Sequence, residues 1–224
     1  MEMMPYHPYE ERGQLRCYDW APLPSVAPSA THDWRARLPV LDGPRLTLRE
    51  LRIEDAAALF AELTTDEVAR FISPPPASVA GFENFIHWAH RERAAGRYAC
   101  FALVPEGETR AVGMFQVRVL DADAGTAEWG FAIGSSYWGT GLFLIGARRV
   151  VDFAFEQMGV RRLEARACVA NARGTGALRK VGAVREQVLP GSFERHGERL
   201  DQALWTIARD DWRFVNATPG GSRH

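Results

Sequence analysis

The chain has 224 residues, of which 46% are hydrophobic and 25% charged, and its formal net charge is -1. This near-neutral balance argues against a general binder of nucleic acid or of membrane surfaces, and it is typical of a soluble protein with one core. The sequence has no apolar run of the roughly 18 residues that a membrane span needs, and its N-terminus lacks the features of a signal peptide, so we expect a cytoplasmic location.

The cysteines and histidines do not predict a metal site. Cys17, Cys100 and Cys168 lie far apart without metal-ligand spacing, and the last two fall inside predicted strands, where we expect them to pack as buried apolar side chains. His87 and His90 lie three residues apart on a predicted helix, with no third ligand nearby in the sequence. We therefore expect neither a metal ion nor a disulfide.

The first 40 residues differ in composition from the rest of the chain. Residues 1–40 contain six of the 13 prolines and show no sustained periodicity, so we predict an extended N-terminal extension. Its aromatic residues are more numerous than a linker needs. The extension could therefore pack on the domain of its own chain or on a second copy in a homodimer, and the sequence does not distinguish the two. One domain is predicted over residues 41–215, followed by a C-terminal tail over residues 216–224.

From residue 41 the hydrophobic pattern becomes regular. Alternating and helical spacings predict, in chain order, a strand at 45–51, helices at 53–63, 66–72 and 79–95, strands at 98–104, 111–120 and 126–133, a helix at 143–158, a strand at 161–169, a helix at 171–181 and strands at 183–189 and 199–207. Three consecutive strands joined by short turns indicate an antiparallel meander. The predicted fold class is α/β or α+β with a mixed sheet.

A glycine-rich turn at residues 137–142, with the sequence YWGTGL, links a predicted strand to the longest predicted helix. Such a turn directs free backbone N–H groups and the helix dipole at one point, which is an arrangement that binds phosphate. Leu142 and Phe143 stand where a Walker A motif needs lysine and a hydroxyl residue, so the turn is not a nucleotide-triphosphate loop. Taken alone, it fits phosphate binding and a plain tight connection equally well.

Four segments fall at corresponding places in this order of elements: RLTLRELRIEDAAALF, AEWGFAIGSSYWGTGL, VVDFAFEQMGVRRLEARACVANARGTGALRKVGAV and GERLDQALWTI. Together they resemble the GNAT acetyltransferase superfamily over residues 45–212, and within it the branch of ribosomal-protein N-terminal acetyltransferases. The resemblance implies a GNAT fold, with a mixed, mostly antiparallel central sheet flanked by helices. It also implies transfer of acetyl from acetyl-CoA directly to the primary amine of a protein N-terminus or a small molecule.

The resemblance further implies how acetyl-CoA is held. Its pyrophosphate is expected on the amides of the turn, and its pantetheine arm along the edge of the preceding strand, where a backbone N–H polarises the thioester carbonyl. Asn171 is expected to cap a helix and also to contact the cofactor arm. The expected cofactor-binding residues are Phe131, Ala132, Ile133, Ser136, Trp138, Gly139, Thr140, Gly141, Leu142 and Asn171.

Direct attack needs a neutral amine, and amines with pKa values of roughly 8 to 10 are mostly protonated near pH 7, so a general base is expected. Glu128 is the predicted base because it is the only ionisable residue of its strand and occupies the acidic position of the family. An ion pair with Arg118 or Arg166 is the alternative role for Glu128. Many relatives carry a serine that protonates the leaving thiolate where this chain has Gly174, and Tyr137 is a second candidate for that role.

The sequence also departs from the family at Ser136, where the cofactor motif begins with glutamine or arginine, so one phosphate contact is lost. The acceptor site is implied between residues 71–79 and a predicted loop at 190–197, in which Glu194 and His196 are expected substrate contacts. Because of these departures, and because the N-terminal extension is rich in proline and aromatic residues, two other functions stay open. The chain could be a CoA-ester-binding regulator without catalysis, or an interaction protein that works through its N-terminal extension.

Overall fold

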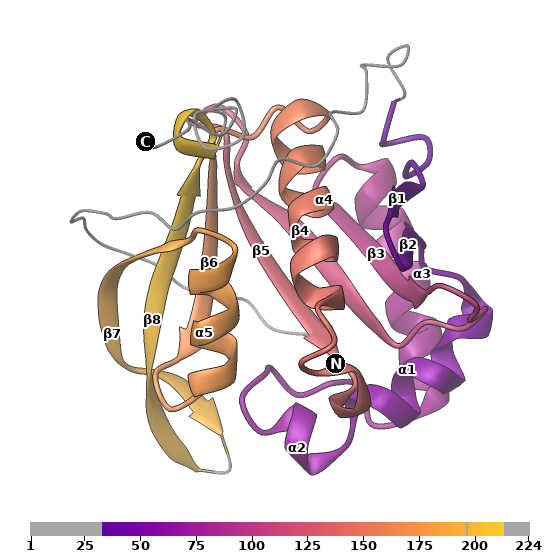
Figure 1. The fold of residues 1–224 in the computed structure, drawn as a ribbon, viewed down its shortest axis with the longest axis horizontal. Helices are drawn as coiled ribbons and strands as arrows, with labels where there is room; N and C mark the ends of the chain where they lie inside the picture. The colour runs from indigo at the N-terminus through magenta and orange to yellow at the C-terminus, as the bar shows by residue number, and fades with distance from the viewer. Residues whose placement is uncertain (1–32, 196, 213–224) are drawn as a thin grey trace, which may run out of the picture.

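The structure, a computed structural model, describes residues 33–195 and 197–212. In these residues eight strands form one sheet in the order β1-β2-β3-β4-β5-β6-β8-β7 (Figure 1). The strands are β1 (Leu41–Gly43), β2 (Leu46–Glu50), β3 (Tyr98–Pro105), β4 (Gly113–Asp121), β5 (Thr126–Ile133), β6 (Arg162–Cys168), β7 (Val184–Arg195) and β8 (Glu198–Ala208). The helices are α1 (Ala56–Leu63), α2 (Asp66–Ala69), α3 (Val79–Ala94), α4 (Leu142–Glu156) and α5 (Ala172–Lys180).

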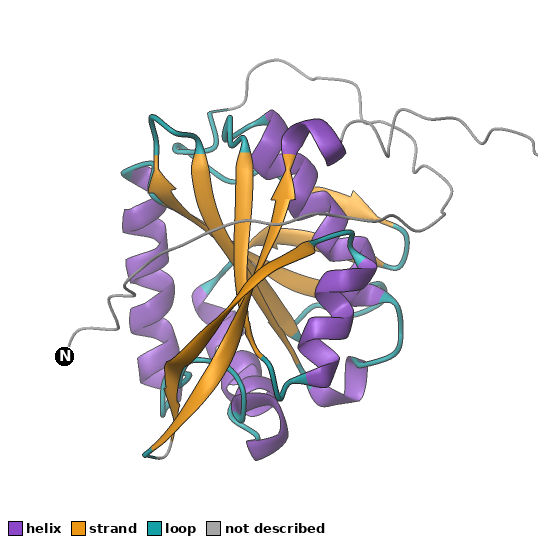
Figure 2. Ribbon diagram, turned by 90° about the vertical axis from the view of Figure 1, so that its left-hand side faces the viewer, coloured by secondary structure: helices purple, strands orange, loops and turns teal. Residues whose placement is uncertain are grey.

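All neighbouring strands pair antiparallel except β5 and β6, which are parallel. The mixed, mostly antiparallel sheet of the prediction is therefore confirmed, and helices lie on both of its faces (Figure 2). No helix in the described part of the chain is long and apolar enough to cross a membrane. Likewise, these residues hold no group of three or more His, Cys, Asp or Glu side chains that could bind a metal ion.

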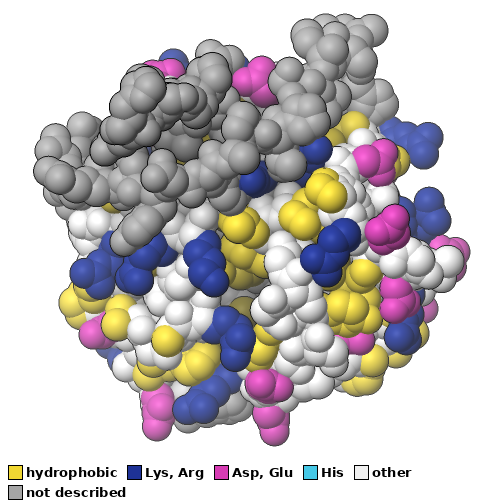
Figure 3. All heavy atoms as spheres, in the orientation of Figure 1, with side chains coloured by type: hydrophobic (Ala, Val, Ile, Leu, Met, Phe, Trp, Pro, Cys, Tyr) yellow, Lys and Arg dark blue, Asp and Glu magenta, His cyan; other side chains and the backbone are white. Residues whose placement is uncertain are grey.

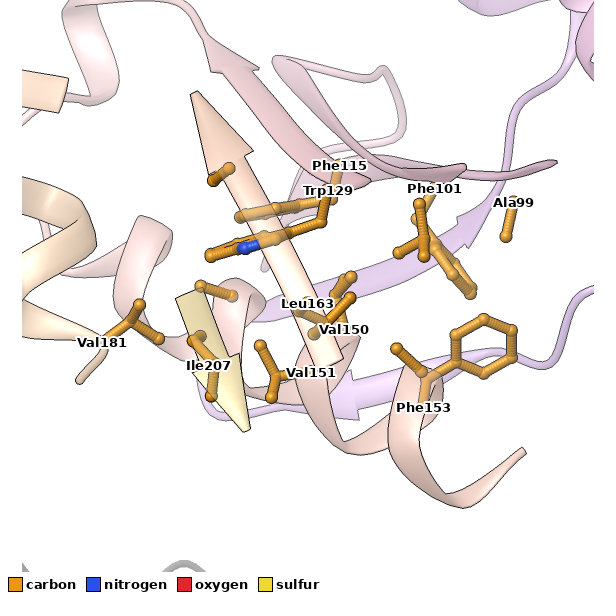
Figure 4. Close-up of a cluster of buried hydrophobic side chains, with 14 of the residues drawn as sticks. Ala99, Phe101, Phe115, Trp129, Val150, Val151, Phe153, Leu163, Val181 and Ile207 are labelled. Atoms are coloured by element: carbon orange, nitrogen blue, oxygen red, sulfur yellow. The ribbon is translucent and has the colours of Figure 1, made fainter. Parts of the chain in front are cut away.

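Each face of the sheet has its own hydrophobic core. On one face, α4 and α5 pack against alternate residues of the strands, and the largest side chains are aromatic, with Trp129 and Phe115 beside Phe101 and Phe153 (Figure 4). On the other face, α1, α2 and α3 enclose a second cluster that includes Phe82. Because strand residues alternate between faces, Ala127 and Trp129 of β5 belong to the first core and Ala132 belongs to the second.

The packed body begins earlier than the predicted domain boundary at residue 41. Trp34 and Leu38 are each only 3% exposed and belong to the α4-side core. The Trp34 ring meets Phe153 edge to face, with 6.3 Å between the ring centroids. At least the end of the predicted N-terminal extension is therefore part of the domain, because it supplies an aromatic anchor that packs on α4.

The last hairpin also differs from the prediction. Residues 190–197 were predicted to be a loop, but β7 continues through Pro190 and Gly191 to Arg195. Shifts in the pairing register between Leu189 and Phe193 absorb the two turn-forming residues, and Gly191 takes a positive φ of 56°. The segment is therefore the distal half of one long hairpin rather than a separate loop.

The cysteine prediction is confirmed for the two cysteines that the structure describes. Cys100 and Cys168 are free and buried. Burial raises the pKa of the Cys100 thiol to about 12, so the thiol stays protonated and unreactive at neutral pH. Cys17 lies outside the described residues.

Candidate functional site

The parallel strands β5 and β6 pair over only three positions, Thr126 with Arg162, Ala127 with Leu163 and Glu128 with Glu164. Beyond Glu128 the two strands separate, and Figure 1 shows them diverging toward the end of β5. The carboxyl half of β5 therefore has an edge that β6 leaves unpaired.

The backbone of β5 shows which groups face this edge. The Gly134 N–H donates to the Val112 carbonyl, at 2.8 Å between N and O, and therefore points toward β4. In an antiparallel pair, successive residues direct their N–H and C=O groups to alternate sides. Phe131 and Ile133 consequently present theirs to the unpaired edge, where the Ile133 carbonyl accepts from the Trp138 indole, whereas those of Ala132 face β4. Of the three predicted pantetheine contacts, two thus have the orientation that main-chain pairing requires.

The turn that follows β5 adopts the conformation that its glycines allow. Gly139 and Gly141 have φ values of 77° and 88°, in the left-handed region that favours glycine. A Cβ built on either residue would meet no atom within 4 Å, so open space lies over the turn. Gly141 is the N-cap of α4, and its carbonyl accepts from the N–H groups of Leu144 and Ile145, whereas the Leu142 N–H lies 3.5 Å from the Thr140 hydroxyl. The positive end of the α4 dipole lies at this open turn, an arrangement that favours an anion.

Arg45 is a candidate site residue that was not among those predicted from the sequence. Its Nη1 donates to the carbonyl oxygen of Thr140 within the turn, at 3.1 Å, across 95 residues of sequence. Among the described residues it is the only non-glycine with a positive φ, 69°. No sequence pattern predicts this contact, because it forms only when β1 and β2 pack near the start of α4. The exposed guanidinium places a positive charge beside the turn.

Glu128 makes both ion pairs that were foreseen as its alternative role. Its Oε2 accepts from Arg118 and its Oε1 from Arg166, each at 2.7 Å. Arg118 lies directly opposite on β4, whereas Arg166 comes from β6. The Glu128 side chain is still 21% exposed. An ionised carboxylate has about four acceptor positions, so these two bonds leave Glu128 capacity to accept another.

The same charges continue across the sheet as an ion ladder, which we define as Arg118, Glu128, Arg166, Glu164, Arg162 and Glu186. Arg166 also lies 3.9 Å from Glu164, which pairs with Arg162 at 3.0 Å. Arg162 reaches Glu186 on β7 at 2.7 Å. Alternating positive and negative side chains therefore link β4 to β7 on the face that carries Glu128, across the point where β5 and β6 separate.

Tyr137, the candidate proton donor, has its hydroxyl 3.5 Å from Glu108 in the turn between β3 and β4. Burial raises the pKa of Tyr137, and the negative charges of Glu108 and Glu62 raise it further. The phenol therefore holds its proton more firmly than a free tyrosine. To donate it to a thiolate beside β5, the hydroxyl would have to leave Glu108.

Asn171 caps α5 as predicted, because its amide oxygen accepts from the Gly174 N–H at 2.8 Å. The geometry also accounts for Gly174. A Cβ there would lie 2.6 Å from the Asn171 Nδ2 atom, so a side chain would displace the cap. The neighbouring Thr175 hydroxyl bonds to the carbonyls of Asn171 and Ala172, at 3.0 and 3.2 Å, and so does not substitute for the missing serine.

Trp138 connects the two sides of the separation between β5 and β6. Its indole N–H donates to the Ile133 carbonyl at 2.9 Å. The Arg173 guanidinium lies over its ring, with Cζ 4.2 Å from the centroid. Since Arg173 is on α5, this pair joins the start of α5 to the turn before α4. Figure 3 shows Lys and Arg side chains over α4 and α5 on this face of the molecule.

A cavity of about 620 Å³ lies between the α1–α2 region and the distal hairpin. The predicted acceptor region supplies part of its wall, because Pro74, Pro75, Pro76 and Ala77 line it together with Arg195. Glu194 is exposed on the same hairpin but does not line the cavity. His196 lies outside the described residues. α1 and α2 cover the sheet face that also carries the Glu128 side chain.

Comparison with known proteins agrees with this geometry. A family model described as "Acetyltransferase (GNAT) domain" matches residues 45–184. The uncharacterised N-acetyltransferase p20 of Bacillus licheniformis is 22% identical over 169 residues, covering 75% of this chain and 95% of p20. Among solved structures, RimJ of Mycobacterium smegmatis in complex with CoA-disulfide is 23% identical, with a TM-score of 0.68 over 74% of this chain and 83% of RimJ.

A ribosomal-protein-S5-alanine acetyltransferase from Vibrio fischeri shares the fold with a TM-score of 0.69 and 17% identity, over 77% of this chain and 98% of the relative. The sheet order, the glycine turn and the sequence match over residues 45–184 are thus consistent with one another. Because the family model spans more than half of the chain, the protein belongs to the GNAT acetyltransferase family.

Proposed function

We propose that the protein transfers the acetyl group of acetyl-CoA directly to a primary amine, of a protein N-terminus or of a small molecule. The observation that carries the proposal is the unpaired edge of β5, which leads directly into a glycine turn that opens α4. An extended pantetheine arm needs main-chain partners in a row, and a diphosphate needs converging N–H groups. This chain offers both within a dozen residues.

The residues present suit acetyl-CoA. Phe131 and Ile133 have N–H groups that face the unpaired edge, and the space over Gly139 and Gly141 is open. The Arg45 guanidinium lies at the turn and adds positive charge for a phosphate. Asn171 uses its amide oxygen for capping, which leaves its NH2 group as a donor toward the cofactor arm.

Glu128 is the proposed acceptor of the amine proton. Its two arginine partners fix the carboxylate at the position where β5 and β6 separate, and its exposed fraction allows a water molecule to carry the proton to it. In the balanced reaction the amine nitrogen forms a bond to the acetyl carbon, the carbon–sulfur bond breaks, and the amine proton passes to Glu128. A proton from solvent or from Tyr137 neutralises the thiolate.

Calorimetric titration of acetyl-CoA, followed by measurement of thiol release with a panel of amines, tests the proposal. We expect binding near micromolar concentration and release of CoA that depends on the amine. Binding without turnover by any amine would favour the regulator, and no binding would favour the interaction protein. The buried Cys100 and Cys168 thiols will not consume the thiol reagent in the native protein, and a Cys17→Ser variant removes the third thiol.

A further inference from the structure

The cavity beside α2 contains two arginine side chains that lack an acidic partner in the described part of the chain. Arg195 donates through Nη2 to the Ala69 carbonyl at 3.1 Å, and its Nε is buried without a hydrogen bond. Arg70 lies with Cζ 5.1 Å from the centroid of Phe71. Neither guanidinium lies within 4.0 Å of a carboxylate in the described residues.

These two arginines contrast with the others on the same face of the sheet. Arg118, Arg162 and Arg166 are all neutralised by glutamates of the ion ladder. In the cavity the lining includes two guanidinium groups and only one carboxylate, Asp66, so one positive charge is left uncompensated. Asp66 begins α2 and Arg70 is its C-cap, four residues later, yet the two do not form an ion pair.

The surroundings strengthen the attraction that such a charge exerts. Phe60, Ala69 and three consecutive prolines supply most of the remaining wall. Apolar groups beside a charge lower the local dielectric, so an anion that lies against this wall gains more from a guanidinium than it would in open water. Guanidinium groups with free N–H donors bind carboxylates and phosphates, often with two parallel bonds.

We propose that the acceptor carries, besides its amine, an anionic group, a carboxylate or a phosphate, that Arg70 and Arg195 bind. This inference rests on the proposed function and narrows its substrate class to amines that bear a nearby anion. A peptide N-terminus without an acidic group close to it does not complement the cavity. The inference also gives the distal hairpin a role, because Arg195 joins β7 to the end of α2 at the substrate.

Matched pairs of acceptors test the inference. Glycine is compared with glycinamide, and phosphoethanolamine with ethanolamine, alongside a short C-terminally amidated peptide that begins with alanine and lacks acidic residues. For each pair, the ratio of kcat/KM for the anionic member to that for the neutral member is measured in the wild type and in Arg70→Gln and Arg195→Gln. Dividing the wild-type ratio by the ratio of a variant for the same pair cancels the intrinsic reactivity of each amine.

We expect the wild type to prefer at least one anionic member, and each variant to reduce that preference on the order of tenfold, as for loss of a charge-assisted bond. The two pairs distinguish a carboxylate from a phosphate. Arg199→Gln, an exposed arginine of the same hairpin that does not line the cavity, should leave the ratios unchanged. Thermal melting and acetyl-CoA titration of each variant report on folding and on the cofactor site.

Equal turnover of the members of both pairs, ratios that both variants leave unchanged, or turnover of the peptide alone would overturn the inference while the proposed function stands. A wild type that binds no acetyl-CoA would overturn the proposed function, and this inference with it. If Arg195→Gln melts at a much lower temperature because its bond to Ala69 is lost, Arg70→Gln decides alone, since Arg70 is exposed and, among the described residues, its side chain makes only the ring contact with Phe71.

Discussion

Glu128 forms ion pairs with two arginines and lies where β5 and β6 separate. A substitution can distinguish its ion-pairing role from its proposed role as the acceptor of the amine proton. If Glu128 accepts the amine proton, Glu128→Gln should lower kcat by about 10²- to 10⁴-fold. The loss should shrink as pH rises toward the pKa of the amine, because more of the amine is then already neutral. The measurement is kcat as a function of pH, together with acetyl-CoA affinity, which should change little.

Glu164→Gln is the matched control, because it removes a neighbouring carboxylate of the same ion ladder without touching the proposed base. If both variants lower kcat equally and with the same pH profile, Glu128 has only the ion-pairing role.

The sequence predicted both roles for Glu128 and named both partners. It could not decide between them, because Arg118 and Arg166 lie on strands that flank β5 only once the sheet is assembled.

Arg45 is predicted to contribute to cofactor affinity. Arg45→Gln removes a charge that lies 3.1 Å from the Thr140 carbonyl, at the turn proposed to hold the pyrophosphate. Loss of a charge-assisted bond should weaken acetyl-CoA binding on the order of tenfold, and it should leave the binding of acetylpantetheine, which has no diphosphate, unchanged. Calorimetry with both ligands measures this. Arg97→Gln, which breaks a surface pair with Glu92, is the control, and an equal effect on both ligands would contradict the assignment.

At the scale of single elements, the position of α4 on the sheet depends on Gly146. A Cβ at this position would lie 2.6 Å from Cε2 of the buried Phe115 ring. That ring is confined between Phe131 and Phe143, whose centroids are 6.1 and 6.0 Å away. Gly146→Ala should therefore destabilise the protein by about 1–3 kcal/mol through overpacking. Urea unfolding measures the change.

Gly176→Ala is a control with the opposite expected sign. A Cβ on Gly176 in α5 would meet no atom within 4 Å. Replacing a helical glycine by alanine in open space should stabilise the protein by up to about 1 kcal/mol. Equal midpoints for the wild type and Gly146→Ala would show that α4 can shift away from the sheet without cost.

The elements also show where the sequence was sufficient. Strand 126–133 was predicted with its observed bounds, because turn residues flank it on both sides and the mostly apolar segment between them has the length and pattern of a buried strand. The distal hairpin was not, because Pro190 and Gly191 signal a turn, and only pairing with β8 shows that a bulge accommodates them. β1 has three residues, which is too few for any period to be visible.

At the scale of the whole molecule, two parts of the sheet meet at one short parallel seam. β1 to β5 and β6 to β8 are joined by three register pairs and by the ion ladder. A ligand that bridges both parts should stabilise the fold. At a hundredfold excess over Kd the gain is about 2.7 kcal/mol, which corresponds to a rise in melting temperature of roughly 5–11 °C for a domain of this size.

Differential scanning calorimetry with acetyl-CoA measures this rise. Acetylpantetheine at the same concentration should raise the melting temperature less. Absence of a shift at concentrations that saturate the protein by calorimetry would mean that the ligand does not bind preferentially to the folded state.

The order of elements predicted the global fold class. The charge of the cavity could not be predicted, because Arg70 and Arg195 are 125 residues apart in sequence and line one cavity only in the folded protein.

The alternation along β5 has a consequence for the exchange of its amide protons with deuterium. The Phe131 and Ile133 N–H groups face the edge that β6 leaves unpaired, whereas those of Ala132 and Gly134 face β4. In the free protein, alternate amides of one strand should therefore exchange at different rates, the first pair faster. Bound acetyl-CoA should slow the fast pair selectively. Uniform protection of all four amides in the free protein would mean that the edge is already covered.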